Sequence, residues 1–253
     1  MTLLALPALA DNYIWLLADA GGSALVVDPG ESAPVDAALA ASGQRLTTIL
    51  LTHHHPDHIG AAADLAARHG ATIHAPRDER IAVADVRIGD HDRVELAEPA
   101  FAFDVIAVPG HTLSHVAYVG HGLLFCGDTL FSVGCGRLFE GTPAQMLASL
   151  ERLAALPDET RVCCGHEYTR TNCAFARSLD PANAALAARA EQADAQRAAG
   201  VPTVPSTLAD ERACNPFLRI DAPALRKALG DGDRIERFAE LRRRKDAFRM
   251  AAP

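Results

Sequence analysis

The chain of 253 residues has few aromatic side chains, no CxxC pair and no long uncharged apolar run. Aromatic residues make up only 5%, but the hydrophobic content of 49% is typical of a folded protein rather than a disordered one. The lack of an apolar run of about 18 residues argues against a membrane-spanning helix. The six cysteines are scattered through a mid-sized chain, which favours reduced, buried thiols and a cytoplasmic protein.

The first ten residues are apolar, but no lysine or arginine precedes Arg45. A secretory signal needs a positively charged start, so this segment is not expected to be a cleaved leader. Its apolar character continues through residues 13–17, which predicts a strand, a turn and a second strand.

Charge and histidine are unevenly distributed along the chain. Residues 167–253 carry 15 basic and 12 acidic side chains, which leaves 9 basic and 20 acidic side chains in residues 1–166. All 11 histidines lie in this acidic first part. With a net charge of −8 the protein lacks the dense basic surface that phosphate contacts require, which argues against nucleic acid as a partner.

Short β-rich segments are interspersed with helical patterns up to residue 167, and only helical patterns follow. Strands are predicted at residues 23–28, 46–52, 71–74, 86–96 in pieces, 101–108, 115–119, 123–126 and 160–164. Helices are predicted at 34–42, 58–69, 144–156 after Thr142-Pro143, 168–178, 183–200, 222–230 and 233–250. The pattern predicts an α/β domain over residues 1–167 and a helical domain over residues 168–253.

The densest group of potential ligands is the motif THHHPDH at residues 52–58, between a predicted strand and a predicted helix. Alternate residues leaving an extended strand point the same way, so His53 and His55 can converge on one point. Asp57 and His58, at the helix entry, can converge on a second point. Imidazole and carboxylate suit zinc, iron or manganese, and the lack of a nearby thiolate argues against a closed structural zinc site.

Three further segments place a potential ligand just beyond a predicted strand. These residues are His111, Asp128 and His166, each preceded by a glycine that suits a tight turn. Ligands gather at the carboxyl ends of strands in α/β folds. Together with the motif at residues 52–58 they supply seven ligands, where one zinc ion needs three or four. The sequence therefore predicts two metal ions that share one carboxylate.

These motifs resemble the metallo-β-lactamase superfamily, whose members carry THxHxDH followed by single His, Asp and His ligands in this order. Other segments narrow the resemblance to the glyoxalase II (hydroxyacylglutathione hydrolase) family and extend it from end to end. They are DNY at residues 11–13, GCGRLFEGT at 134–142, CGHEYT at 164–169, NPFLR at 215–219 and LRRRKDAF at 241–248. The metal motif alone specifies only the superfamily.

The resemblance implies an αββα sandwich followed by an all-helical, glutathione-binding domain. It implies a first metal ion on His53, His55 and His111, a second on Asp57, His58 and His166, and Asp128 as the bridge. Zinc is the expected metal, with iron or manganese as alternatives. The implied glutathione contacts are Arg137, Phe139, Tyr168, Arg242 and Lys245. Some family members have Lys and Tyr at the first two of these positions, so a hydrogen bond from a tyrosine hydroxyl would be absent here or replaced.

The implied reaction is hydrolysis of S-(2-hydroxyacyl)glutathione, with S-D-lactoylglutathione yielding glutathione and D-lactate, the second step of methylglyoxal detoxification. Two divalent ions about 3.5–4 Å apart can activate a bridging water and polarise the thioester carbonyl, so no serine or cysteine nucleophile is required. Asp57 is predicted either to orient the bridging hydroxide or to act as a ligand alone. Arg242 and Lys245 share one side of the last helix and are predicted to bind glutathione carboxylates, although cationic runs at helix ends are commonly solvated surface.

Other functions remain open from the sequence. A persulfide dioxygenase of the same superfamily would hold a single iron on two histidines and one aspartate, and would usually lack the helical domain. A metal-dependent nuclease would need a basic groove, and a non-catalytic metal-binding protein would be expected to lose ligands. We expect a cytoplasmic monomer that acts on a small glutathione thioester, with neither nucleic acid nor a membrane as partner.

Overall fold

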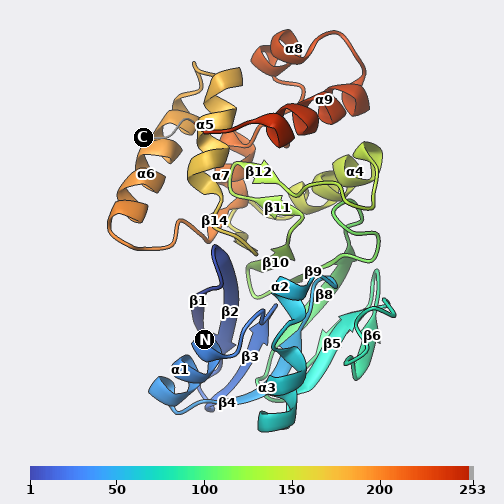
Figure 1. Ribbon diagram of the computed structural model, residues 1–253, viewed down its shortest axis with the longest axis vertical. Helices are drawn as coiled ribbons and strands as arrows, with labels where there is room; N and C mark the ends of the chain where they lie inside the picture. Colours follow the sequence, from blue (N-terminus) through green and yellow to red (C-terminus); the bar gives the residue numbers. More distant parts are fainter. Residues whose placement is uncertain (251–253) are drawn as a thin grey trace. The chain divides into compact units, whose positions relative to one another are not determined.

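The computed structural model describes residues 1–250 and divides the chain into two units (Figure 1). The first unit comprises Met1–Ala107, Ser114–Gly127 and Cys163–His166. The second comprises Val108–Leu113, Asp128–Val162 and the chain from Glu167 onward. The second unit thus joins two segments from before residue 167 to the one that begins at Glu167, and the division into domains over residues 1–167 and 168–253 stays a prediction.

The first unit contains a mixed sheet of six strands in the order β1-β2-β3-β4-β5-β6. Its strands are β1 (Thr2–Ala8), β2 (Asn12–Ala18), β3 (Ser23–Val27), β4 (Arg45–Leu50), β5 (Thr72–Pro76) and β6 (Val86–Ile88). The first three strands are antiparallel neighbours, whereas β3 to β6 run parallel. Because β3 and β4 end at the same edge, the Asp28 amide donates to the Leu50 carbonyl at 3.0 Å.

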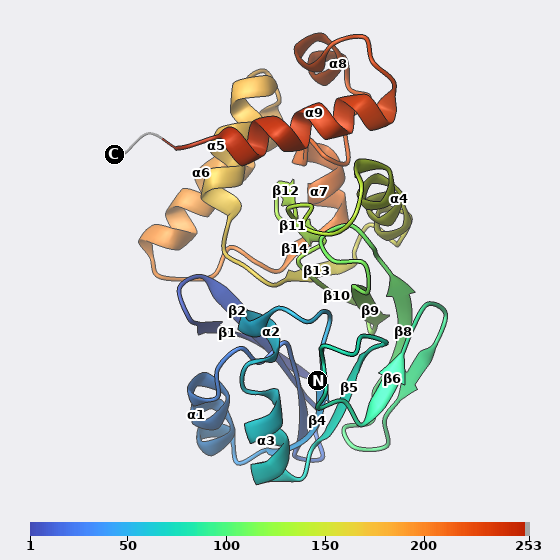
Figure 2. The same cartoon turned by 45° about the vertical axis from the view of Figure 1, so that its right-hand side comes forward.

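Two helices, α1 (Ala33–Ser42) and α3 (Ala62–His69), cover one face of this sheet (Figure 2). Val35 and Leu39 of α1 and Leu65 of α3 pack into the same buried cluster as the side chains of β2 to β5. Apolar burial of this kind is the main source of the stability of the layer.

The prediction of one helix over residues 58–69 is wrong, because a short helix α2 (Pro56–Ile59) ends before α3 begins. The amide of Ala61 donates to the Pro29 carbonyl at 2.9 Å. A Cβ atom at Gly60 would lie only 2.6 Å from the Gly30 carbonyl oxygen. The loop after β3 therefore packs directly on the turn between the two helices.

A second sheet has the order β14-β13-β10-β9-β8-β7. Its strands are β7 (Arg93–Glu95), β8 (Ala102–Ala107), β9 (Val116–Gly120), β10 (Leu123–Gly127), β13 (Arg161–Cys164) and β14 (Ser206–Thr207). In the first unit the two sheets pack face to face, with the rings of Trp15 and Phe125 6.5 Å apart. The hydroxyl of Tyr118 on β9 donates to the Leu51 carbonyl at 2.8 Å.

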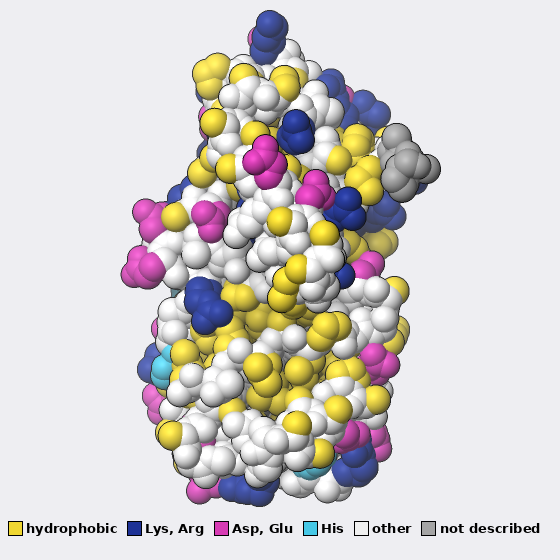
Figure 3. All heavy atoms as spheres, turned by 90° about the vertical axis from the view of Figure 1, so that its left-hand side faces the viewer, with side chains coloured by type: hydrophobic (Ala, Val, Ile, Leu, Met, Phe, Trp, Pro, Cys, Tyr) yellow, Lys and Arg dark blue, Asp and Glu magenta, His cyan; other side chains and the backbone are white. Residues whose placement is uncertain are grey.

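The strand β1 lies at the edge of the first sheet and carries apolar side chains that are not fully buried. Leu4 and, in the following turn, Leu9 are exposed to 39% and 51%. Figure 3 shows hydrophobic side chains gathered on the face of the first unit that lies to the left in Figure 1, where β1 is found.

The second unit is largely helical. It contains a hairpin of β11 (Leu130–Phe131) and β12 (Gly134–Cys135), and the helices α4 (Pro143–Ala154), α5 (Thr169–Leu179), α6 (Ala184–Ala198), α7 (Leu208–Cys214), α8 (Pro223–Leu229) and α9 (Arg234–Ala247). The predicted start of α4 is confirmed, since the Thr142 side chain accepts a hydrogen bond from the Gln145 amide. The predicted fold class, α/β with a C-terminal helical region, is confirmed as well. Within residues 1–250 no helix is both long and apolar enough to cross a membrane.

Candidate metal centre

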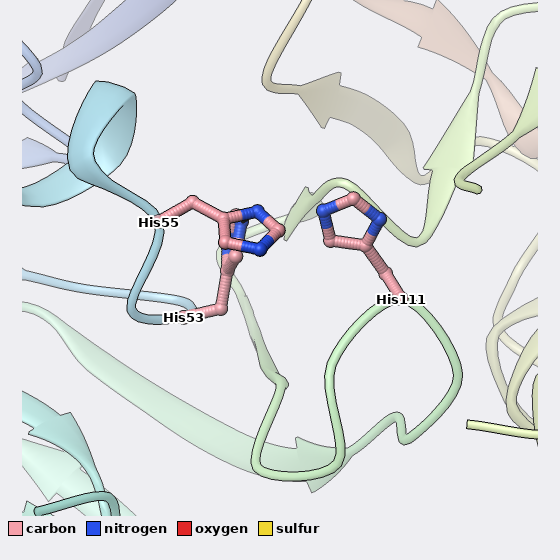
Figure 4. A group of neighbouring side chains, drawn as sticks. All are labelled: His53, His55 and His111. Carbon is pink, nitrogen blue, oxygen red and sulfur yellow. Dashed lines mark hydrogen bonds between the residues drawn. The ribbon is translucent and has the colours of Figure 1, made fainter. Parts of the chain in front are cut away.

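Two histidines of the loop after β4 face one another in the first unit. The Nε2 atom of His53 lies 3.1 Å from Nδ1 of His55. Figure 4 shows both rings on this loop, and it also shows His111 on the loop after β8. The structure thus brings the first two imidazoles together, as the alternation of side chains at a strand end predicts.

Asp28, directly after β3, orients two of the predicted ligands. Its Oδ2 atom lies 2.7 Å from the Thr52 hydroxyl, which donates to it, and 3.1 Å from Nδ1 of His58. The same hydroxyl oxygen lies 3.0 Å from Nδ1 of His53 and can accept from it. Each Nδ1 then carries the hydrogen, which leaves the lone pair of Nε2 for a metal ion.

Asp28 was missed by the sequence analysis. The signal that could have found it is an acidic residue placed directly after a buried strand, in Val27-Asp28-Pro29-Gly30. Asp28 is also one of the non-glycine residues with positive φ, at 53°. A residue held in this sparsely populated conformation is a useful indicator of a functional position.

A second group of ligand atoms comes from Asp57, His58 and His166, which all belong to the first unit. The Oδ2 atom of Asp57 lies 3.5 Å from Nε2 of His58 and 3.4 Å from Nε2 of His166. Two ligands bound to zinc at about 2.0–2.1 Å in tetrahedral geometry are about 3.4 Å apart. The donor set and its spacing therefore fit a divalent cation.

The residues that follow β1 hold two members of this second group. The Oδ1 atom of Asp11 lies 2.8 Å from Nδ1 of His166, so that its Nε2 is left for ligation. The side-chain amide of Asn12 donates to Oδ2 of Asp57 at 2.9 Å. The roles of Asp11 and Asn12 were not predicted beyond their place in a family motif.

The two remaining predicted ligands, His111 and Asp128, belong to the second unit and lie close together. Nε2 of His111 is 3.4 Å from Oδ2 of Asp128, and both residues are buried. Nδ1 of His111 lies 2.8 Å from the carbonyl oxygen of Arg137. Because a carbonyl can only accept, this contact places the hydrogen on Nδ1 and leaves Nε2 available for a metal.

Two of the five predicted glutathione contacts, Arg137 and Arg242, lie close to Asp246 in the second unit. Its Oδ1 atom is 3.3 Å from Nε of Arg137 and 2.9 Å from Nη2 of Arg242. Arg242 is only 6% exposed, and its Nη1 atom donates to the Cys135 carbonyl at 2.7 Å. The donors of Arg242 thus already contact protein oxygens, whereas the side chain of Arg137 is half exposed.

Lys245 lies between two aromatic rings of the second unit. Its ammonium is 5.6 Å from the ring centre of Phe175 and 5.7 Å from that of Phe248. Burial, followed by the positive charge of Arg242, lowers the pKa of Lys245 from 10.5 to about 8. A lysine of this kind still carries its charge at neutral pH.

The two aromatic residues of the predicted glutathione site are accessible. Phe139 is 61% exposed, and its ring centre lies 5.2 Å from that of His111. Tyr168 is 37% exposed and packs edge-on against Phe131. Binding of glutathione by these residues, by Arg137, by Arg242 and by Lys245 stays a prediction.

The expectation of buried thiols is confirmed. All six cysteines are buried free thiols. His115 is fully buried, contacts the Val116 carbonyl through Nδ1 and stacks on His53 with ring centres 4.6 Å apart.

Comparison with known proteins matches both parts of the chain. A family model described as "Metallo-beta-lactamase superfamily" matches residues 10–166, and one described as "Hydroxyacylglutathione hydrolase C-terminus" matches residues 167–248. A protein of Cupriavidus metallidurans named hydroxyacylglutathione hydrolase is 53% identical, over 96% of this chain and 98% of its own length. One of the same name from Xanthomonas euvesicatoria pv. vesicatoria is 51% identical, over 98% of this chain and 100% of its own.

Two solved structures are similar as well. ETHE1 from Myxococcus xanthus is 26% identical with a TM-score of 0.66, and the match covers 98% of this chain and 99% of that one. TTHA1623 in a di-iron-bound form is 28% identical with a TM-score of 0.54, and the match covers 66% and 92%. The metallo-β-lactamase fold with these His and Asp groups forms a site for divalent metal. The chain belongs to the hydroxyacylglutathione hydrolase (glyoxalase II) family of the metallo-β-lactamase superfamily.

Proposed function

We propose that this protein hydrolyses S-D-lactoylglutathione to glutathione and D-lactate, the second step of methylglyoxal detoxification. The observation that carries the proposal is the coexistence of all seven ligand positions with the C-terminal region of the hydroxyacylglutathione hydrolases. Relatives of that name are 51–53% identical over nearly the whole chain. The proposed setting is a cytoplasmic monomer with a catalytic domain over residues 1–167 and a substrate domain over residues 168–253.

The proposed cofactor is a pair of divalent ions, zinc in the first place, with iron or manganese as alternatives. His53, His55 and His111 would hold the first ion, Asp57, His58 and His166 the second, and Asp128 both. Support comes from the donor set, which consists of imidazole and carboxylate without thiolate, and from a solved relative in a di-iron-bound form. When bound, two such ions supply an activated water at neutral pH and polarise the thioester carbonyl.

The residues around the ligands orient them before any metal binds. Asp28, Asp11 and the Arg137 carbonyl each contact an Nδ1 atom, so that His58, His166 and His111 present Nε2. Ligands held in this way need little rearrangement on metal binding, which favours high affinity. Asp57, whose side chain is 38% exposed, can contact a water molecule as well as a metal.

Substrate recognition is assigned to positive charge and exposed aromatic surface in the second unit. Glutathione carries two carboxylates, for which the half-exposed Arg137 and the protonated Lys245 are the accessible cations. Asp246 contacts both Arg242 and Arg137. Arg242 therefore contributes to this site by holding Asp246, which in turn orients Arg137. Phe139 and Tyr168 offer ring faces to the peptide part of the substrate.

The experiment is an assay of the purified protein with S-D-lactoylglutathione, following loss of thioester absorbance and release of free thiol. The expected result is turnover that depends on bound metal and stops after chelation. A protein that holds two metal ions and shows no turnover would refute the proposal. Oxygen consumption with glutathione persulfide, measured in parallel, would instead favour the persulfide dioxygenase reading.

A further inference from the structure

The β11–β12 hairpin connects Asp128 to Arg137 and is held by polar side chains from several helices of the second unit. Figures 1 and 2 both show it beside α7. Ser132 accepts two of these hydrogen bonds, one at its carbonyl from Asn172 of α5 and one at its hydroxyl from Arg189 of α6, both at 3.0 Å. Asn215, after α7, donates to the carbonyls of Phe131 and Gly134 at 3.1 and 3.0 Å. Arg242 of α9 donates to the Cys135 carbonyl at 2.7 Å.

Glu211 of α7 is the acceptor at the centre of this arrangement and is fully buried. Its Oε2 atom accepts from the Val133 amide at 2.7 Å and from Asn215 at 3.0 Å, and its Oε1 atom accepts from Ser206 at 2.7 Å. Ser132 also hydrogen-bonds to this carboxyl group. Burial raises the pKa of Glu211 above its ordinary value, although these donors act in the opposite direction. All of these partners donate, so the side chain at this position must supply acceptors, and an ionised carboxylate supplies acceptors alone.

The hairpin turn needs such support because Val133 has a φ of 58°. Left-handed backbone is unfavourable for a β-branched residue, so it persists only where its surroundings impose it. The bond from the Val133 amide to Glu211 lies at this residue itself. Glu211 therefore binds the hairpin residue whose backbone conformation is unfavourable.

The hairpin transmits its geometry to both of its ends. Leu130 pairs with Cys135, and the Gly136 amide donates to the Thr129 carbonyl at 3.1 Å, which brings Asp128 and Arg137 to adjacent ends of the ladder. A Cβ atom at Gly136 would collide with the Asp128 carbonyl oxygen. The packing thus leaves little room for the Asp128 backbone to move independently of the hairpin.

We propose that Glu211 is a positioning residue that, through the hairpin, places Asp128 for metal binding and Arg137 for the substrate. The inference rests on the proposed function, because it takes Asp128 as a metal ligand. It assigns to the helical part of the chain a role in building the metal centre, beyond that of binding glutathione.

The test compares Glu211→Gln with Asp210→Ala in the full-length protein. Gln keeps the volume of Glu211 but places a donor among donors. Asp210→Ala removes the capping box of the same helix without touching the hairpin. Zinc affinity, measured by competition with a chelator below the unfolding midpoint of each variant, should fall about 10- to 100-fold for Glu211→Gln, as for other residues that orient ligands. It should stay within about twofold for Asp210→Ala.

Hydrogen exchange in the zinc-free protein gives a readout that does not depend on the metal. The Val133 amide should lose protection in Glu211→Gln and keep it in Asp210→Ala. Equal zinc affinity of Glu211→Gln and the unmodified protein, or an equal loss in both variants, would overturn the inference, as would unchanged protection of Val133.

If Glu211→Gln fails to fold, Ser132→Ala, which removes one donor to the carboxylate, replaces it under the same criteria. Failure of the unmodified protein to bind zinc, iron or manganese, or to turn over the thioester, would instead refute the proposed function, while the exchange measurement would still decide the role of Glu211.

Discussion

The carbonyl oxygen of Arg137 accepts a hydrogen bond from Nδ1 of His111 over 2.8 Å, so a residue predicted to bind substrate also orients a predicted metal ligand. Its side chain points elsewhere, to Asp246. We therefore propose that one residue serves the metal through its backbone and the substrate through its guanidinium.

Arg137→Ala separates these two roles. The carbonyl remains, so metal content should equal that of the unmodified protein, while KM for S-D-lactoylglutathione should rise about tenfold through loss of one ionic contact. Metal analysis and steady-state kinetics on the same preparation check this. Loss of metal in Arg137→Ala would contradict the division of roles.

His55→Ala and Asp128→Ala should each abolish turnover together with metal binding, because each removes a proposed ligand from a buried or half-buried site. Metal content by elemental analysis and thioester hydrolysis are the measurements. His91→Ala is the matched control, since the His91 side chain is 85% exposed. Full activity in either variant would show that the substituted residue is not a required metal ligand.

The substrate affinity should weaken above about pH 8. The pKa of Lys245 is lowered to about 8, so the ammonium is charged at pH 7 and loses its proton as the pH rises through that value. Between pH 7 and pH 9 the KM should therefore increase. In Lys245→Arg the charge persists throughout this range, and the increase should be reduced. Parallel profiles for the two proteins would show that Lys245 does not contact the substrate.

Arg242→Ala should lower the free energy of unfolding as well as raise KM. The variant leaves the Cys135 carbonyl and Asp246 without a buried donor, at a cost of about 1–3 kcal/mol. Arg243→Ala, which removes an exposed arginine that pairs with Glu240, should leave both quantities nearly unchanged. Chemical denaturation and kinetics measure the two effects. An unaltered free energy of unfolding would mean that the contacts of Arg242 with the Cys135 carbonyl and Asp246 make no net contribution to stability.

Gly30→Ala should displace Asp57 and His58, although Gly30 itself is not a proposed ligand. A Cβ atom at this position would overlap the carbonyl of Asp57, so the segment that carries Asp57 and His58 must shift. We expect lower zinc affinity and a lower unfolding temperature, measured by chelator competition and calorimetry. Gly21→Ala is the control, because its Cβ would meet only the flexible side chain of Asp19. Wild-type zinc affinity in Gly30→Ala would contradict this reading.

Local patterns were sufficient for several features. Thr142-Pro143 predicted the start of α4, because capping depends on residues within one helical turn. The alternation in the motif at residues 52–58 predicted that His53 and His55 converge, because side-chain direction follows from an extended backbone. The break between α2 and α3 could not be predicted in this way, since it depends on the packing of the loop around Gly30.

The sequence by itself determined the kinds of candidate ligand, their order along the chain and the family, because these depend on residue identity and spacing. Only the tertiary structure decided which groups orient the ligands and hold the segments that carry them. Asp28 lies 30 residues from His58, and Glu211 lies 78 residues from Val133, yet each pair is joined by a hydrogen bond. Contacts between residues so far apart arise from the packing of sheets and helices, which no local pattern records.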